Sequence, residues 1–277
     1  MEVDPVHSNN PALAVTPGQL LEAMRAKNPL VQNITNFVAM NIAANVMLAV
    51  GASPAMVHSA EESAEFAAIA SALTVNIGTI SPDFLAGMKQ AARAAGENGK
   101  PWVLDPVAHF ATSYRRAAVA EMLALKPTVI RGNASEIIAL AGERSGGQGV
   151  DAGDSIASAE LAAGTLAKRH GCVVAVTGEH DFVTDGKRSA HVIGGSAWMP
   201  KVTALGCALT GVVGAFVATA PEQPFDATLA ALSVFAAAGE KAGKDAGGPG
   251  SFAVRFLDEL ARLTPIELDA SDRVVPA

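Results

Sequence analysis

Short apolar segments alternate with longer helical patterns along most of this chain, and this alternation limits the possible folds more than any other feature. The segments 73–77 (LTVNI), 102–105 (WVLD), 128–131 (TVIR) and 172–177 (CVVAVT) are typical of buried strands. Helical patterns lie between them, and the amphipathic stretch 82–97 is the clearest. Strands and helices in this order predict a mainly parallel sheet with helices on both faces, which is an α/β fold of three layers.

The remaining segments predict further elements. A helix at 37–50 is expected to be capped by Thr35 or Asn36, because such side chains accept hydrogen bonds from the first helical N–H groups. The other expected elements are a helix at 61–71, a glycine-rich loop at 142–154, a hairpin formed by 182–185 and 189–193, and a polar tail after 263.

We expect one domain over residues 1–277, with residues 1–16 as a loose arm, because no linker or change of composition divides the chain. The apolar segment 38–57 has the length of a membrane span. It contains Asn41 and Asn45 and lacks flanking basic residues, so we interpret it as a buried helix, a turn and a short strand. The sequence therefore predicts no membrane contact.

Composition disfavours several classes of function. The residues are 50% hydrophobic and 17% charged, which is typical of a globular protein. The formal net charge is -7 and no cluster of Lys and Arg occurs, so we expect no nucleic-acid partner. Cys172 and Cys207 cannot build a disulfide framework, and the first residues lack the pattern of a signal peptide. We therefore expect a cytoplasmic protein.

Polar residues follow most of the predicted strands, at the positions where α/β sheets bind ligands. They are Asn33, Gly78-Thr79, Asp105, Arg131-Gly132-Asn133 and Thr177-Gly178-Glu179. Taken singly, each is more often a turn or cap residue. Because the carboxyl ends of parallel strands meet at one edge of a sheet, their recurrence predicts a binding site at that edge.

The stretch 199–216 (MPKVTALGCALTGVVGAF) predicts a helix that begins near a glycine. The first N–H groups of a helix lack intrahelical partners and, together with the helix dipole, favour an anion. Here these would be the N–H groups of Leu205, Gly206 and Cys207, and the pKa of the Cys207 thiol should be lowered at this position. The alternative is a core helix with a small buried cysteine.

Two carboxylates and one arginine suit phosphoryl transfer. Asp105 ends a buried strand, and Glu136 lies in the first turn of a predicted helix. Both suit a Mg²⁺ ion that keeps several of its waters. Arg131 is a fork-shaped donor for phosphate oxygens. The alternatives are a helix-dipole role for Glu136 and a salt bridge for Arg131.

Other common site patterns are missing. The sequence contains neither a Walker A pattern nor a dinucleotide-binding GxGxxG after a first strand. Four histidines lack the spacing of metal ligands and are interpreted as surface or packing residues: His58, His109, His180 and His191.

Six longer strings resemble one family in unbroken order along the chain. They are QNITNFVAMNIAANVMLAVGASPAM (32–56), WVLDPVA (102–108), LKPTVIRGNASEIIALAG (125–142), VAVTGEHDFVTDG (174–186), KVTALGCALTGVVGAF (201–216) and GPGSF (248–252). They resemble hydroxyethylthiazole kinase, which belongs to the ribokinase-like superfamily. The resemblance implies a ribokinase-like αβα fold and ATP-dependent, Mg²⁺-assisted phosphorylation of the hydroxyl of 4-methyl-5-(2-hydroxyethyl)thiazole, for thiamine biosynthesis or salvage.

The same resemblance implies a homotrimer with active sites at its interfaces, and a role for each candidate residue. By role these are Met56, Asn33 and Ala204 at the thiazole, Arg131, Thr177 and Asp105 at ATP, Asp105 and Glu136 around Mg²⁺, and Cys207 at the catalytic position.

One string departs from the family's usual pattern, because Ala204-Leu205-Gly206-Cys207 stands where the family usually has Gly-Thr-Gly-Cys. Ala204 adds a methyl group where we expect unusual backbone dihedrals, and Leu205 replaces a hydroxyl donor. The anion hole is built from backbone N–H groups and should survive. Two other functions stay open: phosphorylation of another small alcohol, such as a hydroxymethylpyrimidine or a sugar, and binding of nucleotide or thiazole without turnover.

Overall fold

The structure is a computed structural model that describes residues 13–142 and 152–277. Within these residues nine strands form one sheet in the order β2-β1-β3-β4-β5-β6-β7-β8-β9. The strands are β1 (Leu30–Ile34), β2 (Ser53–Ala55), β3 (Ala72–Asn76), β4 (Trp102–Asp105), β5 (Val129–Asn133), β6 (Val173–Thr177), β7 (Asp181–Thr184), β8 (Ser189–Val192) and β9 (Val274–Pro276).

The prediction of a mainly parallel sheet is confirmed. Strands β1 to β6 pair in parallel, and β7, β8 and β9 continue the sheet antiparallel. The predicted hairpin is present as β7 and β8, and Gly186 in its turn has a φ of 84°, a value that glycine adopts without strain. Because β1, β3, β4, β5 and β6 run in one direction, their carboxyl ends share one edge of the sheet.

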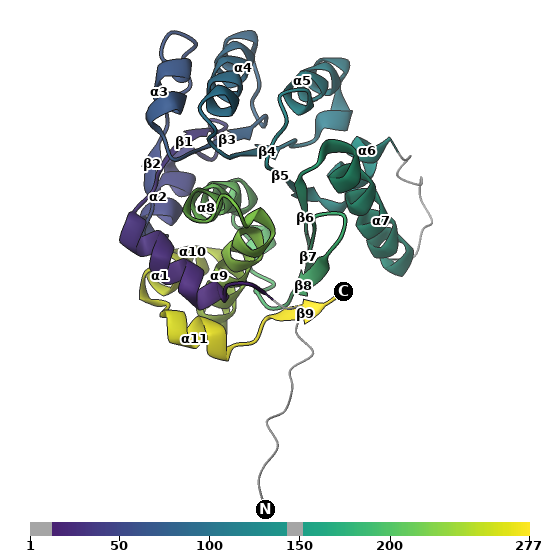
Figure 1. Ribbon diagram of the computed structural model, residues 1–277. Helices are drawn as coiled ribbons and strands as arrows, with labels where there is room; N and C mark the ends of the chain where they lie inside the picture. Colours follow the sequence, from purple (N-terminus) through teal and green to yellow (C-terminus); the bar gives the residue numbers. More distant parts are fainter. Residues whose placement is uncertain (1–12, 143–151) are drawn as a thin grey trace, which may run out of the picture.

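Helices cover both faces of the curved sheet, which confirms the three layers (Figure 1). The outer face carries α3 (Ser63–Ile69), α4 (Pro82–Glu97), α5 (Ser113–Leu123), α6 (Ala134–Ala141) and α7 (Ala152–His170). The inner face carries α1 (Pro17–Lys27), α2 (Met40–Val50), α8 (Leu205–Thr219), α9 (Pro224–Lys244), α10 (Pro249–Arg262) and α11 (Pro265–Ala270). Short 3-10 helices are η1 (His109–Ala111) and η2 (Met199–Lys201).

Helix α8 packs closely onto the sheet because small residues lie on its sheet-facing side. A Cβ atom added at Gly214 would lie 2.4 Å from Thr74 Cγ2 of β3, and one at Gly211 would lie 3.3 Å from Asn33 Nδ2 of β1 and 2.6 Å from Met47 Sδ of the neighbouring helix α2. Both α8 and α9 are buried along most of their length and form the main core with α1, α2 and α10. The helix that carries Cys207 is therefore held firmly against the middle of the sheet.

The predicted cap of α2 is only partly right. Asn36 Oδ1 accepts hydrogen bonds from the backbone N–H groups of Val38 and Ala39, both at 3.1 Å. These bonds hold a turn that precedes the helix, so α2 begins at Met40 rather than at residue 37. The buried Thr35 hydroxyl has no hydrogen-bond partner among the described residues and makes no cap.

Other predicted boundaries also differ from the structure. Helix α3 is shorter than the 61–71 expected, because the Ser71 N–H already donates to Leu30 O at 2.7 Å and joins the sheet. The predicted glycine-rich loop lies outside the described residues from 143 to 151, and α7 begins at Ala152. The expected loose arm was residues 1–16, and its residues 1–12 also lie outside the described part of the chain.

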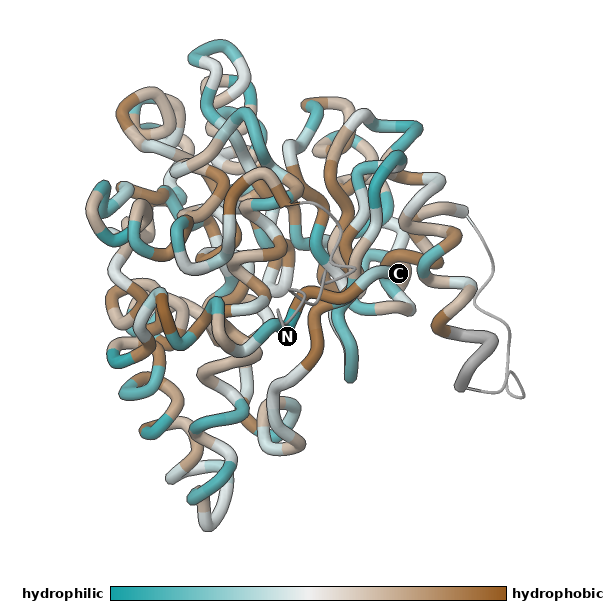
Figure 2. Tube along the Cα trace, turned by 60° about the horizontal axis from the view of Figure 1, so that its bottom comes forward, coloured by the Kyte–Doolittle hydropathy of each residue, from teal (hydrophilic) through white to brown (hydrophobic). Residues whose placement is uncertain are grey.

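The prediction of a polar tail after residue 263 is wrong. Helix α11 follows α10 and starts with a capping box made by Thr264 and Glu267. Strand β9 then pairs antiparallel with β8, and its hydrophobic colouring is visible next to the C label in Figure 2. The last residues of the chain therefore extend the central sheet.

The segment 38–57 forms α2, a turn at Gly51 and β2, in the predicted order. Only one side of α2 is buried: Val46 and Met47 lie in the core, whereas Leu48 is 60% exposed. In the part of the chain that the structure describes, no helix has the length and apolar composition needed to cross a membrane.

Candidate functional site

Helix α8 begins after Ala204, which adopts the left-handed conformation with a φ of 63°. The first intrahelical hydrogen bond runs from the Ala208 N–H to Ala204 O at 2.9 Å, so the N–H groups of Leu205, Gly206 and Cys207 precede it. The Leu205 side chain is 4% exposed and packs into the main core. Leucine at this position therefore contributes apolar packing, and the predicted anion hole needs only its backbone.

Arg131 of β5 places its guanidinium group against the start of this helix. A Cβ atom added at Gly206 would lie 3.1 Å from both Nη1 and Nη2 of Arg131. Nη2 also donates to Thr177 Oγ1 at 2.6 Å, and Nη1 lies 3.4 Å from Asp105 Oδ2. A buried cation beside the positive end of a helix dipole is unfavourable by itself. An anion bound between them offsets both charges, so this arrangement indicates an anion site.

Asp105 lies fully buried at the end of β4, and its two carboxylate oxygens differ. Oδ2 accepts hydrogen bonds from Asn76 Nδ2 at 2.7 Å and from Thr210 Oγ1 at 2.8 Å, in addition to its contact with Arg131. Oδ1 is buried without a partner among the described residues. Burial raises the pKa of Asp105 to about 6, although Arg131 opposes the shift and Glu136 adds to it. Such a perturbed carboxyl group in a polar cluster is typical of a functional site.

Cys207 stands beside this cluster in the first turn of α8. Asn36 Nδ2 donates to Cys207 Sγ at 3.3 Å and also to Asn76 Oδ1 at 2.8 Å. Since Asn76 donates to Asp105, a chain of amide side chains connects the thiol to the buried carboxyl group. The structure therefore brings together four residues that were predicted separately from the sequence: Cys207, Asp105, Arg131 and Thr177.

The expectation of a lowered pKa for the Cys207 thiol is wrong for the protein without ligand. Burial of the thiol and, second, the charge of Asp105 raise its pKa, and they outweigh the hydrogen bond from Asn36 and the charge of Arg131. The helix dipole alone was the basis of the prediction, whereas a buried carboxylate nearby disfavours the thiolate.

Glu136 lies in the first turn of α6, where the alternative interpretation gave it a helix-dipole role, and the structure shows that it also caps this helix. Its Oε2 accepts a hydrogen bond from the Asn133 N–H, and Asn133 Oδ1 accepts one from the Glu136 N–H, so the two form a capping box. Its Oε1 accepts from the Ala108 N–H at 2.9 Å and fastens the loop after β4. The described residues contain no group of three or more His, Cys, Asp and Glu side chains suited to a metal ion.

Two residues proposed for substrate binding lie on the β1–β2 side of the sheet. Asn33 is buried beneath α8, where its Nδ2 donates to Met47 Sδ at 3.4 Å and its Oδ1 accepts from Thr74 at 2.8 Å. Both the nitrogen and the oxygen of the Asn33 amide thus have hydrogen-bond partners within the protein. Met56 is half-buried at the carboxyl end of β2, next to Val57, whose carbonyl accepts a hydrogen bond from Gln32 Nε2 at 3.0 Å. Contact of either residue with a substrate stays a prediction.

Comparison with known proteins decides the family. The model of the Hydroxyethylthiazole kinase family matches residues 21–266. The chain belongs to the hydroxyethylthiazole kinase family. A hydroxyethylthiazole kinase of Rhizobium johnstonii is 67% identical over 95% of this chain and 98% of that relative.

Solved structures agree with this membership of the hydroxyethylthiazole kinase family. A hydroxyethylthiazole kinase protein from Pyrococcus horikoshii matches with a TM-score of 0.82 and 41% identity, covering 90% of this chain and 93% of that one. A ribokinase-like superfamily protein from Enterococcus faecalis matches with a TM-score of 0.63 and 11% identity, covering 93% of this chain and 100% of that one. The second likeness concerns the fold alone and confirms the ribokinase-like architecture.

Three polar residues of this family member contact the candidate residues but were not proposed from the sequence: Asn36, Asn76 and Thr210. Asn36 lies two residues after β1, and Asn76 is the last residue of β3. Thr210 lies about one helical turn after Cys207. The signal was therefore present, but strand ends usually contain asparagine for turn formation.

The histidines behave as predicted where the structure gives contacts. His58 stacks on Phe84 with ring centroids 4.5 Å apart, and His109 is buried. His191 Nε2 lies 3.4 Å from Glu160 Oε1, and His180 is exposed. None of them contacts Cys207 through a hydrogen bond in the described part of the chain.

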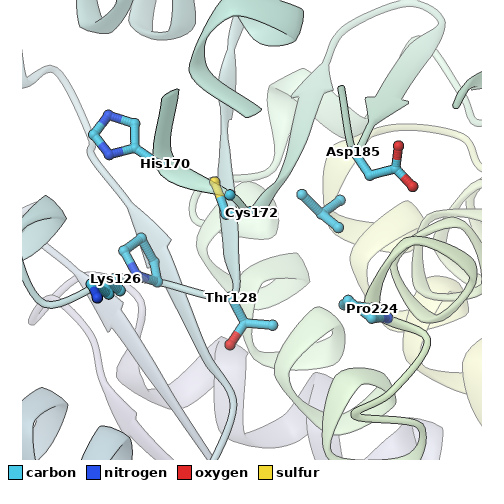
Figure 3. A pocket seen from close by; sticks show the side chains of 9 residues that line it. Lys126, Thr128, His170, Cys172, Asp185 and Pro224 are labelled. Carbon is cyan, nitrogen blue, oxygen red and sulfur yellow. The ribbon is translucent and has the colours of Figure 1, made fainter. Parts of the chain in front are cut away.

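A cavity of about 350 Å³ lies away from this site (Figure 3). Its lining includes Thr128 and Cys172, which immediately precede β5 and β6, and Pro224 at the start of α9. It therefore opens at the amino ends of the strands, opposite the edge where Asp105 and Arg131 lie. Burial raises the pKa of the Cys172 thiol to about 12, so this thiol is unreactive at neutral pH.

Proposed function

We propose that this protein transfers the γ-phosphoryl group of ATP to the hydroxyl of 4-methyl-5-(2-hydroxyethyl)thiazole and so supplies thiazole phosphate for thiamine biosynthesis or salvage. The observation that carries the proposal is the meeting of Arg131, Asp105 and Cys207 at the start of α8. Membership of the hydroxyethylthiazole kinase family supports the choice of substrate.

The reaction follows from the position of each group. Arg131 and Thr177 bind phosphate oxygens, while the N–H groups of Leu205, Gly206 and Cys207 stabilise charge on the transferring phosphoryl group. The thiazole hydroxyl oxygen bonds to the γ-phosphorus as the bond from that phosphorus to the bridging oxygen of ADP breaks. Cys207 either orients this hydroxyl or takes its proton, and substitutions at position 207 separate the two roles.

Asp105 and Glu136 fit the Mg²⁺ ion that accompanies ATP. The buried Asp105 Oδ1 has no protein partner among the described residues, and the charge of Glu136 is close enough to raise the pKa of Asp105. Two carboxylates, completed by waters and phosphate oxygens, are a usual set of ligands for this ion. When bound, Mg²⁺ offsets negative charge on the phosphates.

An assay of ADP release tests the proposal. Purified protein with Mg²⁺, ATP and hydroxyethylthiazole should release ADP in step with thiazole phosphate, detected by mass spectrometry. A panel of hydroxymethylpyrimidine and sugars distinguishes a kinase for another alcohol. Binding of ATP and the thiazole by calorimetry without ADP release would establish the non-catalytic alternative.

Binding of Mg²⁺ and ATP should weaken as the pH falls through about 6, because Asp105 then takes up a proton. The sign follows from its raised pKa: the folded protein without ligand holds this proton up to about pH 6, while the unfolded chain loses it near 3.8. The contribution of Asp105 to stability is therefore lost as the pH rises to 6, whereas its affinity for a cation increases.

Calorimetric titration of the protein with ATP in the presence of Mg²⁺, repeated between about pH 5 and pH 8, measures this change in affinity. The variant Asp105→Asn is the control, because the nucleotide still takes up protons in this experiment whereas residue 105 cannot. Asp181 also has a pKa raised to about 6 by burial, with the Gly178 N–H and, second, Arg131 opposing the shift, so Asp181→Asn is the second control. Equal pH dependence in wild type and Asp105→Asn would contradict the assignment.

A homotrimer with active sites at its interfaces also belongs to the proposal. Phe37 and Val38, directly after Asn36, are 65% and 60% exposed, and Leu48 on α2 is 60% exposed. Apolar surface of this kind next to a site supports an interface there. Sedimentation equilibrium should give three times the chain mass of 28.1 kDa. Two unpaired cysteines support the cytoplasm as the compartment.

A further inference from the structure

Arg115 connects two turns that border the proposed active site. It lies in the first turn of α5, where its own N–H donates to Thr112 Oγ1, and its side chain is half-buried. Nη1 donates to Ile77 O at 3.0 Å and to Val107 O at 2.8 Å, and Nη2 donates to Gly78 O. Ile77 and Gly78 directly follow β3, and Val107 is the second residue after β4, so one guanidinium group joins two neighbouring strand ends.

The first of these turns determines the position of Asn36. The Gly78 N–H donates to Asn76 Oδ1 at 2.9 Å, the same oxygen that accepts from Asn36 Nδ2. A Cβ atom added at Gly78 would lie only 2.6 Å from Asn36 Nδ2, so the Gly78 backbone directly contacts this amide. Because Asn36 donates to Cys207 Sγ, a displacement of Gly78 shifts the amide that holds the thiol.

The second turn determines the position of the acidic part of the site. Val107 is the second residue after Asp105, and the N–H of the next residue, Ala108, donates to Glu136 Oε1 at 2.9 Å. Ala108 has a φ of 47°, an uncommon value for a residue with a side chain, so this turn needs outside support. Arg115 supplies that support at Val107 O.

We propose that Arg115 is a positioning residue for phosphoryl transfer. It holds Asn36 against Cys207 through Gly78, and through Val107 it holds the turn that connects Asp105 to Glu136. The inference rests on the proposed function. A lysine at this position keeps the charge but cannot donate to three carbonyl groups in a planar fork, so the geometry is specific for arginine.

Kinetics of Arg115→Met and Arg115→Lys test the inference. We expect kcat to fall about 10- to 100-fold in both variants, since small displacements of reacting groups have effects of this size. Any rise in KM for ATP should be smaller than the fall in kcat, because the contact between Arg131 and Thr177 involves neither turn. The matched control is Arg116→Met on the same helix, since Arg116 Nη1 donates to Phe110 O at 2.7 Å and to neither turn.

A second measurement is independent of catalysis. The rate of Cys207 alkylation by iodoacetamide is followed against pH, without substrates and in a Cys172→Ala background. Its midpoint should move to higher pH in Arg115→Met, because the Asn36 hydrogen bond is one of the influences that lower the pKa of this thiol. Asp105, Arg131 and Asn76 also act on the thiol and are present in every variant.

The outcomes separate the two hypotheses. If kcat and the alkylation profile of Arg115→Met equal those of Arg116→Met, Arg115 has no positioning role. If the profile shifts but the wild-type protein phosphorylates no thiazole, the positioning role holds and the proposed function fails. If Arg115→Met does not fold, Gly78→Ala disturbs the same contact with Asn36, and an unchanged profile in that variant overturns the inference.

Discussion

Replacement of Cys207 by alanine should lower kcat by about 10²-fold or more, which is the lower end of the range for a group that assists proton transfer. Cys207 lies in the first turn of α8, and Asn36 donates a hydrogen bond to its Sγ, which stands next to the cluster around Asp105. KM for ATP should stay close to the wild-type value, because Arg131 and Thr177 are unchanged. Steady-state ADP release measures both parameters.

Two further substitutions distinguish a base from an orienting group at position 207. Burial and the charge of Asp105 raise the pKa of the Cys207 thiol above its ordinary alkaline value, so the thiol is protonated at neutral pH in the free enzyme. A protonated thiol orients the substrate hydroxyl, and Cys207→Ser should then retain more activity than Cys207→Ala. If the group acts as a base, Cys207→Asp should be the more active variant.

Thermal unfolding of each Cys207 variant is the necessary control, because Cys207 is partly buried. An unchanged kcat in Cys207→Ala would remove this residue from the chemistry. An inactive but stably folded Cys207→Asp, together with an inactive Cys207→Ser, would indicate that the site requires the size and shape of the thiol rather than its proton transfer.

The layers of the fold could be predicted because each depends on local patterns. Apolar segments such as 73–77 and 102–105 became the central strands β3 and β4 with boundaries close to those expected. In a parallel sheet these strands end at a common edge, so the proximity of Asp105, Arg131 and Thr177 followed from topology alone.

The hydrogen-bond network around the thiol could not be predicted in the same way. Asn36, Asn76 and Thr210 meet at Asp105 and Cys207 only because β1, β3, β4 and α8 have one particular register. The pKa of Cys207 has the same origin. A position at a helix start favours a lower pKa, but burial of the thiol and, second, the charge of Asp105, more than a hundred residues earlier in the chain, raise it.

The carboxyl-terminal error has a different cause. Thr264, Pro265 and Glu267 form a recognisable helix start, with a capping box and a proline at the first position, and the pattern was present in the sequence. Strand β9 contains only Val274–Pro276, and so short a segment is a strand only because it pairs with β8. The helix could have been predicted, whereas the strand depends on tertiary structure.

Replacement of Arg131 should have the other large effect, with kcat/KM for ATP about 10²- to 10³-fold lower in Arg131→Lys. The arginine fork contacts Thr177 Oγ1 and Asp105 Oδ2 while its Nη1 and Nη2 atoms lie against Gly206, so it can reach an anion in front of α8 with a fixed geometry. Lysine keeps the charge but not the fork. A large loss in Arg131→Lys would therefore show that geometry, in addition to charge, stabilises the transferring phosphoryl group.

Arg131→Met separates this catalytic effect from a structural one. Removal of the cation leaves Asp105 buried without its main charge partner, and its pKa should rise further, because Arg131 is the influence that most opposes the shift caused by burial. The melting temperature of Arg131→Met should therefore be lower than that of the wild type at neutral pH and recover as the pH falls, when Asp105 takes up a proton. The activity should not recover with it, because a protonated Asp105 cannot replace the guanidinium group at the phosphates. Recovery of both together would mean that Arg131 serves the fold and that the anion site lies elsewhere.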